Sequence, residues 1–262
     1  MRSAHNQPDL WLEFFGRHSD EYSIYLHSKI PSDVTQPIWR EAIIPKYIHT
    51  AWGDISIVRA TLALLDAAFQ DPTNEHFILL SESCIPIKPF AIIKSEILGD
   101  PRGRMAWQHA SDTVSKARAN RMGVALNISQ SHWIYHHQWI TFSRPMASIL
   151  LETDKTNDFE KVRVPDECYF GSVLSFLDFN FESGILPILS TYTDWDRPRP
   201  VRSGPYLYKD IDMADVEQLR SSGCLFARKF SPDSPIRRFG LHLPGSHSQS
   251  DCTNMQQYGI LQ

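Results

Sequence analysis

The chain has 262 residues, 42% of them apolar, and no low-complexity tract, so we expect a packed globular core. Its net charge of −4 argues against a general electrostatic grip on nucleic acid, and no apolar run approaches the roughly 20 residues that span a bilayer. The four cysteines are widely spaced without a CxxC pair, which favours buried small side chains over a zinc site or a redox motif.

The first hundred residues alternate helix-like and strand-like patterns. The predicted helices cover 10–15, 55–69 and 88–98, and the predicted strands cover 22–28 and 76–81. This order favours an α/β fold with a mostly parallel sheet. Ligands bind beyond the carboxyl ends of the strands in such sheets, so His27 and Ser28 after one strand and Glu82 after the next mark a candidate ligand site.

The rest of the chain continues this pattern after a break. Residues 99–130 are polar, basic and aperiodic, which is typical of a long loop. Further strands are predicted over 132–143, 184–195 and 224–230, and further helices over 144–154, 165–177 and 212–223. No repeat or linker is visible, so we expect a single domain over residues 1–262, with 241–262 as a polar tail.

Three histidines in one predicted strand raise the question of a zinc site. His132, His136 and His137 lie in the run HWIYHHQWITFS. Because neighbouring side chains on a strand face opposite sides, we expect structural roles for these histidines. The following Gln138 and Trp139 are expected to line a cleft.

Two adjacent carboxylates, Asp166 and Glu167, follow Pro165 at the start of a predicted helix. One interpretation is structural, since carboxylates in a first turn offset the positive helix end by roughly 0.3–1 kcal/mol each. The other interpretation is chemical, with one carboxylate acting as a general base aimed into a cleft. The pair alone does not decide between them.

Two basic segments bear on that choice. Arg228 and Lys229 end an otherwise apolar strand and should point to opposite faces, so at least one lies near the core or a cleft. An unpaired cation there is costly, and either a bound anion or a protein carboxylate would resolve the cost. Arg197, Arg199 and Arg202 are concentrated in one loop, which fits a phosphate clamp or a solvated basic loop equally well.

Several blocks of the sequence resemble the core-2/I-branching β-1,6-N-acetylglucosaminyltransferase family, especially its plant-type branch and its xylosyltransferase-like relatives. They follow the family's order, cover most of residues 9–232, and read LWLEFF, YSIYLHS, AWGDISIVRATLALLDAAFQDPTNEHFILLSESCIPI, HHQWITFSR, PDECYFGSVL, TYTDWDR and CLFARKFSP. FILLSESCIPI and CLFARKF are the most specific of these blocks.

The resemblance implies a GT-A-like fold, with a Rossmann-like, mostly parallel sheet flanked by helices. Residues 9–100 would form the nucleotide-sugar half and residues 101–240 the acceptor and catalytic half. Members of the family are inverting transferases that need no metal ion, and their catalytic glutamate is matched by Glu167. Their diphosphate-binding arginine and lysine are matched by Arg202 and Lys229, and an aromatic residue near the acceptor is matched by Trp195.

The resulting hypothesis is an inverting, metal-independent transfer of GlcNAc or xylose from a UDP-sugar to a glycan hydroxyl. Fixed cations aimed at the departing diphosphate lower the barrier of such a transfer. The expected donor-diphosphate residues are Lys229, Arg202, Arg197 and Arg228, and the expected nucleotide or donor residues are His27, Ser28, Trp52, Glu82 and Gln138. The expected acceptor residues are Trp195, Asp166 and Trp139, with Asp166 as a helix cap or as the partner that orients Glu167.

Two alternatives stay open. Asp194 and Asp196 have the Asp-x-Asp spacing of metal-binding glycosyltransferases, although the pair comes late in the chain, after the segment of the proposed base. The chain could also be an inactive module that binds a sugar or a nucleotide. We expect no cofactor besides the UDP-sugar substrate and no nucleic-acid partner.

The sequence departs from the family pattern at its start and in two loops. Family members usually carry a membrane anchor, a stem and an apolar strand before the LW…FF helix, whereas this chain starts at that helix. We therefore expect a soluble chain, either a cytoplasmic algal or viral enzyme or a trimmed Golgi-lumenal domain. The loops at 101–130 and 198–206 match the family poorly, so the acceptor is open.

Overall fold

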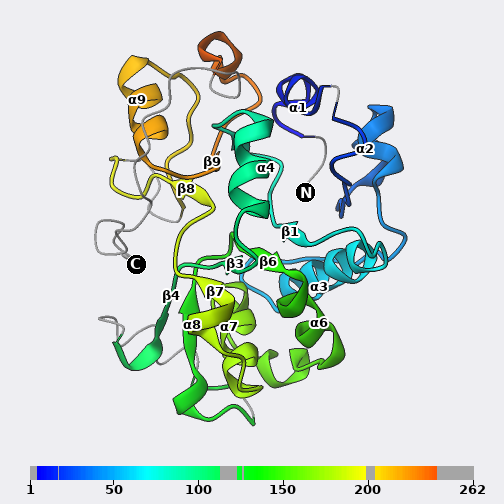
Figure 1. Cartoon of the computed structure of the whole chain (residues 1–262), viewed down its shortest axis with the longest axis vertical. Helices are drawn as coiled ribbons and strands as arrows, with labels where there is room; N and C mark the ends of the chain where they lie inside the picture. Colours follow the sequence, from blue (N-terminus) through cyan, green and yellow to red (C-terminus); the bar gives the residue numbers. More distant parts are fainter. Residues whose placement is uncertain (1–4, 17, 113–122, 126, 199–203, 241–262) are drawn as a thin grey trace.

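The computed structural model describes residues 5–16, 18–112, 123–125, 127–198 and 204–240. Short strands form its interior and helices pack around them (Figure 1). In this part of the chain, no helix combines the length and the apolar character that crossing a membrane requires.

The strands form three small sheets. The first sheet has the order β1 (His76–Ile78), β6 (Thr141–Ser143), β3 (Gly103–Arg104), β7 (Ile185–Leu186). The second sheet has the order β2 (Ile85–Pro86), β9 (Phe226–Arg228), β8 (Thr191–Thr193). The third sheet pairs β4 (Trp107–His109) with β5 (Ile134–His136).

The α/β class is confirmed, but the expectation of a mostly parallel sheet is wrong for the described residues. The β3–β7 and β8–β9 pairs are parallel, whereas β1–β6, β3–β6, β2–β9 and β4–β5 are antiparallel. A parallel neighbour needs a long crossover, usually a helix. The chain instead passes from β5 into β6 through the short turn at 137–140, so the single strand predicted over 132–143 is two strands in two sheets.

Helices occupy most of the positions that the apolar periodicity predicts. They are α1 (Pro8–Phe15), α2 (Pro37–Glu41), α3 (Ser56–Phe69), α4 (Phe90–Leu98), α6 (Arg144–Glu152), α7 (Tyr169–Phe176), α8 (Phe181–Gly184) and α9 (Met213–Ser221). Short 3₁₀ turns lie at η1 (Pro31–Asp33), η2 (Ala110–Asp112), η3 (Gln130–His132), η4 (Thr156–Phe159), η5 (Pro165–Glu167) and η6 (Ile236–Phe239).

The ends of α3 illustrate how local chemistry bounds an element. At its start, the Asp54 carboxylate accepts a hydrogen bond from the Ser56 amide at 2.8 Å. At its end, the Arg144 guanidinium donates to the carbonyl of Phe69 at 3.0 Å and lies 4.1 Å from the centroid of that ring. Arg144 is the first residue of α6, so this contact joins the start of α6 to the end of α3. The two helices pack side by side (Figure 1).

The strand predicted over 22–28 is wrong. In that segment only Leu26 pairs, through an isolated parallel bridge to Ile43, and the flanking residues form no ladder. Apolar alternation makes a strand favourable, but a strand also needs a partner along its length.

The core consists of hydrophobic clusters that join these elements. One buries Phe142 of β6 against Phe170 of α7, with the ring centroids 5.2 Å apart. A second lies around β2, β8 and β9, and a third packs α1 and α4 around Trp11. Cys84, Cys168 and Cys224 are buried as expected, and Cys252 lies outside the described residues.

Helix α7 approaches β5 so closely that only glycine fits between them. A Cβ on Gly171 would lie 2.5 Å from Cγ2 of Ile134, whereas a Cβ on Gly204 would meet nothing within 4 Å. We expect Gly171→Ala to lower the free energy of unfolding by about 1–3 kcal/mol through overpacking. Gly204→Ala is the matched control and should leave the denaturation midpoint unchanged; equal stability of both variants would contradict the close approach.

Candidate functional site

The two carboxylates of the PDE motif occupy a separate 3₁₀ turn in front of α7. Val164 begins this turn in the left-handed conformation, and the Glu167 amide donates to its carbonyl at 3.2 Å. Cys168 then has φ −150°, which interrupts the helical backbone before Tyr169. The prediction of one helix over 165–177 is therefore wrong at its start, and neither carboxylate lies in the first turn of α7.

Asp166 is a buried acidic residue. The N-cap residues of the 3₁₀ turn and of α7 are Val164 and Cys168, so Asp166 does not occupy the cap position of either element. The residue is only 6% exposed, and its buried Oδ1 has no hydrogen-bond partner. Burial, and then the charge of Glu167, raise the pKa of Asp166 to about 7, although Arg228 partly opposes this. The adjacent Glu167 is half-buried.

Arg228 ends β9, and its positive charge interacts with Asp166 of this turn. Its guanidinium carbon lies 4.2 Å from the centroid of the Trp139 ring, and its buried Nε has no hydrogen-bond partner. Burial lowers the pKa of Arg228, while Cys84, Glu82 and Asp166 act in the opposite direction. Among the residues with described positions, no carboxylate lies within 4.0 Å of Arg228. The direct protein ion pair that the sequence left open is thus not formed there.

The surroundings of Arg228 bring together several predicted site residues from distant parts of the chain. Glu82 follows β1, and Gln138 and Trp139 form the turn between β5 and β6. Lys229 directly follows Arg228, is half-buried, and accepts a hydrogen bond at its carbonyl from the Tyr208 amide at 2.8 Å. Carboxylates, an indole face and cations therefore converge at the end of β9.

His27 and Ser28 are buried, and each accepts a hydrogen bond from a backbone amide. The Ile48 amide donates to Nε2 of His27 at 3.1 Å, and the Ile30 amide donates to Oγ of Ser28 at 3.3 Å. Burial lowers the pKa of His27, which favours the neutral ring. Their contact with a nucleotide stays a prediction.

Trp52 lies next to the segment that precedes the carboxylate turn. The ring is 71% exposed, and the Arg163 guanidinium carbon lies 5.9 Å from its centroid. The Val164 amide donates to the Gly53 carbonyl at 2.9 Å. Sequence reasoning missed Arg163 and Val164, because nothing local to them indicates a contact with residues so far away along the chain.

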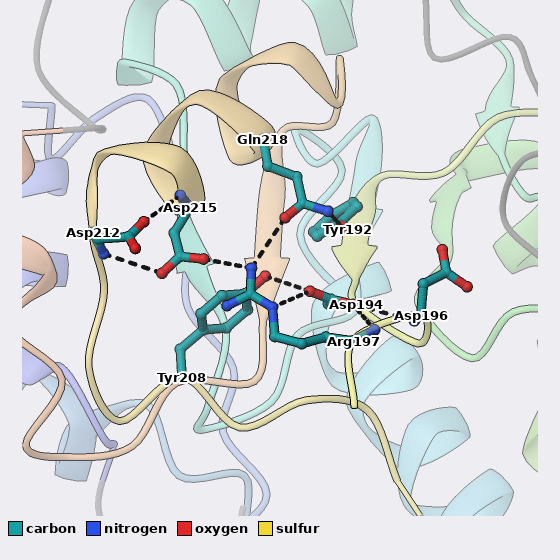
Figure 2. Close-up of polar contacts among 8 residues, drawn as sticks. All are labelled: Tyr192, Asp194, Asp196, Arg197, Tyr208, Asp212, Asp215 and Gln218. Carbon is teal, nitrogen blue, oxygen red and sulfur yellow. Dashed lines mark hydrogen bonds and ion pairs between the residues drawn. The ribbon is translucent and has the colours of Figure 1, made fainter. Parts of the chain in front are cut away.

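Asp194 and Arg197 belong to a structural network (Figure 2). The Asp194 carboxylate is 2% exposed, lies 3.3 Å from Nε of Arg197, and accepts from the Tyr208 hydroxyl at 3.1 Å. The Arg197 guanidinium also meets Asp215, which caps α9 reciprocally with Asp212. Burial favours a lower Arg197 pKa, but Asp215 and the neighbouring tyrosines raise it overall.

This network changes how the Asp-x-Asp pair is interpreted. Both Asp194 oxygens are used by Arg197, Tyr208 and backbone amides, whereas the Asp196 side chain is exposed and points away from the network (Figure 2). In the described parts of the chain, no group of three or more His, Cys, Asp or Glu side chains could hold a metal ion. Trp195, between the two aspartates, is half-buried, and Arg199 and Arg202 lie outside the described residues.

Comparisons with known proteins match most of the chain. A family model described as "Branch: Core-2/I-Branching enzyme" matches residues 1–220, which include the carboxylate turn and end before β9. The chain is also 23% identical over 202 residues to "Glycosyltransferase BC10" from Oryza sativa subsp. japonica. That match covers 74% of this chain and 44% of the rice protein, so the chain spans less than half the length of this curated relative.

The network predicts different effects for the two aspartates. Asp194→Asn removes one of the two buried carboxylates that pair with Arg197, and we expect a loss of unfolding free energy on the order of 2–3 kcal/mol. Asp196→Asn is the matched control on the exposed side and should change stability by less than about 0.5 kcal/mol. Chemical denaturation measures both, and equal losses would contradict the structural role of Asp194.

Burial of Asp166 makes stability depend on pH in a defined direction. Its pKa is about 7 in the fold against a usual value of 3.8, so the folded chain binds this proton more tightly than the unfolded chain does. The contribution of Asp166 to stability is therefore complete below pH ~4 and is lost as the pH rises from about 4 to about 7.

We expect Asp166→Asn to gain stability relative to the unmodified chain across that pH range. The gain should reach at most ~4 kcal/mol above pH 7, since each pKa unit corresponds to ~1.4 kcal/mol. Melting temperatures between pH 4.5 and 8 test this, with Asp210→Asn as an exposed control. A stability difference that is constant over this range would refute the raised pKa.

Proposed function

The chain belongs to the Core-2/I-branching enzyme family, and we propose from this premise that it is a glycosyltransferase that uses a UDP-sugar. The observation that supports this most directly is the half-buried Arg228, whose buried Nε has no hydrogen-bond partner. Among the described residues it has no carboxylate within ion-pair distance, and its charge interacts with Asp166 of the carboxylate turn. A buried donor without an acceptor costs free energy, and a ligand rich in oxygen atoms close by would offset that cost. A UDP-sugar is a ligand of this kind.

The proposed reaction is an inverting displacement. Glu167 takes the proton of an acceptor hydroxyl, and the acceptor oxygen attacks the anomeric carbon of the donor sugar from the face opposite the diphosphate. The bond between that carbon and the diphosphate oxygen breaks, and UDP leaves with the electron pair. Lys229, together with Arg202, stabilises the negative charge that develops on the diphosphate.

We propose GlcNAc or xylose as the transferred sugar, a glycan hydroxyl as the acceptor, and no requirement for a divalent ion. The bonding of Asp194 supports the last point, because its carboxylate would have to give up Arg197 and Tyr208 to bind a metal ion. The proposed roles of Arg202 in diphosphate binding and of Trp195 in acceptor binding rest on the family resemblance. For Arg197, the ion pairs with Asp194 and Asp215 favour a structural role over diphosphate binding.

The test measures UDP release from UDP-GlcNAc and UDP-xylose, with and without a panel of glycan acceptors, in excess EDTA. We expect the unmodified chain to release UDP, and Glu167→Gln to lose about 10²–10⁴-fold in rate through loss of the base. Glu217→Gln, on the exposed face of α9, is the matched control and should keep the full rate.

Other outcomes point to other functions. Activity that is abolished by EDTA and restored by Mn²⁺ would favour a metal-dependent transferase that uses Asp194 and Asp196. Binding of UDP without turnover of any donor would favour an inactive binding module. Full activity of Glu167→Gln would contradict the assignment of the base.

A further inference from the structure

Asp166 of the carboxylate turn and Arg228 at the end of β9 each keep one buried polar atom without a hydrogen-bond partner. Asp166 is 6% exposed and its Oδ1 has no hydrogen-bond partner, while the buried Nε of Arg228 also lacks one. Buried polar atoms without partners are uncommon in folded proteins because each loses its hydration without compensation. The two residues come from segments more than sixty positions apart, so the coincidence is not a local feature of one loop.

The unused atoms have complementary chemistry. Oδ1 of Asp166 accepts a hydrogen bond and Nε of Arg228 donates one, and each residue lies within the electrostatic range of the other. Sugar hydroxyl groups both donate and accept, so neighbouring hydroxyls on one ring can satisfy both atoms. The indole of Trp139, 4.2 Å from the Arg228 guanidinium, adds the flat apolar surface that sugar rings favour.

A diphosphate fits this position less well. Asp166 and Glu82 both lie within electrostatic range of Arg228, and Glu167 adds its charge to Asp166. Phosphate oxygens placed among these carboxylates would be repelled. A neutral polyol avoids that repulsion while still using the guanidinium.

The positions of the two residues along the chain indicate whether the transferred sugar or the acceptor sugar is bound. Asp166 precedes Glu167, the proposed base at the acceptor hydroxyl, and Arg228 precedes Lys229, the proposed diphosphate ligand. The transferred sugar is the only group that is bonded to the diphosphate and also approached by the acceptor oxygen. Because Asp166 and Arg228 adjoin these two groups in sequence, a position beside that sugar is favoured for them.

On the basis of the proposed function, we propose that Asp166 and Arg228 form a subsite that binds hydroxyl groups of the sugar being transferred. The subsite holds the ring while the acceptor oxygen approaches, and its burial keeps water away from the anomeric carbon. Arg228 then acts in donor-sugar recognition rather than in diphosphate binding.

Calorimetry separates this subsite from the diphosphate site, because UDP contains the diphosphate and lacks the sugar. UDP, UDP-GlcNAc, UDP-xylose and UDP-glucose are titrated into the unmodified chain, Asp166→Asn, Arg228→Gln and Lys229→Ala. We expect Asp166→Asn and Arg228→Gln to bind UDP within about twofold of the unmodified chain and to bind the preferred UDP-sugar at least tenfold more weakly. Lys229→Ala should weaken UDP and the UDP-sugar equally, and Asp210→Asn, which is exposed, should change neither.

A second measurement separates the loss of one hydroxyl contact from a general defect of the variant. Deoxy analogues of the preferred UDP-sugar, each lacking one ring hydroxyl, are titrated into the unmodified chain and into Asp166→Asn. One analogue should lose at least tenfold in affinity for the unmodified chain and less than threefold for Asp166→Asn, because the missing hydroxyl and the missing carboxylate belong to one interaction.

Each remaining outcome has a definite meaning. If UDP binds but the sugar adds no affinity, or if Asp166→Asn and Arg228→Gln weaken UDP and the UDP-sugar equally, the subsite is overturned and the proposed function is unaffected. If every deoxy analogue loses the same factor with both proteins, Asp166 does not contact the sugar. If the unmodified chain binds neither UDP nor any UDP-sugar, the proposed function fails, and the subsite fails with it.

Discussion

The placement of β9 between β2 and β8 is the constraint on which the candidate site depends. Ala227 lies opposite Ile85 on one side, and Arg228 lies opposite Thr193 on the other. A strand with partners on both edges has no freedom to shift its register when its apolar residues are buried. The end of β9 is therefore held beside the turn after β1 and beside the segment that leads into the Asp194 network.

Two arginines near this sheet show the difference between a structural and a candidate functional cation. Arg197 meets the carboxylates of Asp194 and Asp215 and lies 4.5 Å from the centroid of the Tyr206 ring, so its charge and its hydrogen bonds are satisfied by the protein. Arg228 has the face of Trp139 and a buried Nε that no described group satisfies. The contacts of Arg197 are therefore explained by folding alone. Arg228 lacks an acceptor for its Nε, and a ligand can supply one.

The sequence predicted helices well because their signal is local. The helices α1, α3, α4, α6 and α9 follow from apolar spacing, capping residues and the positions of proline and glycine, and the capping box at Asp212 is one such signal. Strand predictions were less successful, because a strand is stable only with partners that the sequence does not identify. Segment 22–28 has the composition of a strand, but only Leu26 forms a bridge, and the mixed strand directions depend on connections that run through loops.

The sequence by itself determined the α/β class, the helices, the family resemblance and the residue types of the candidate site. Only the tertiary structure decided which of those residues find hydrogen-bond and charge partners within the protein and which do not. It committed Asp194 and Arg197 to a network, separated the PDE turn from α7, and left one buried polar atom each of Asp166 and Arg228 without a hydrogen-bond partner. The physical reason is that helix formation and capping depend on neighbours in the chain, whereas burial and the partner of a buried charge depend on segments that only the fold brings together.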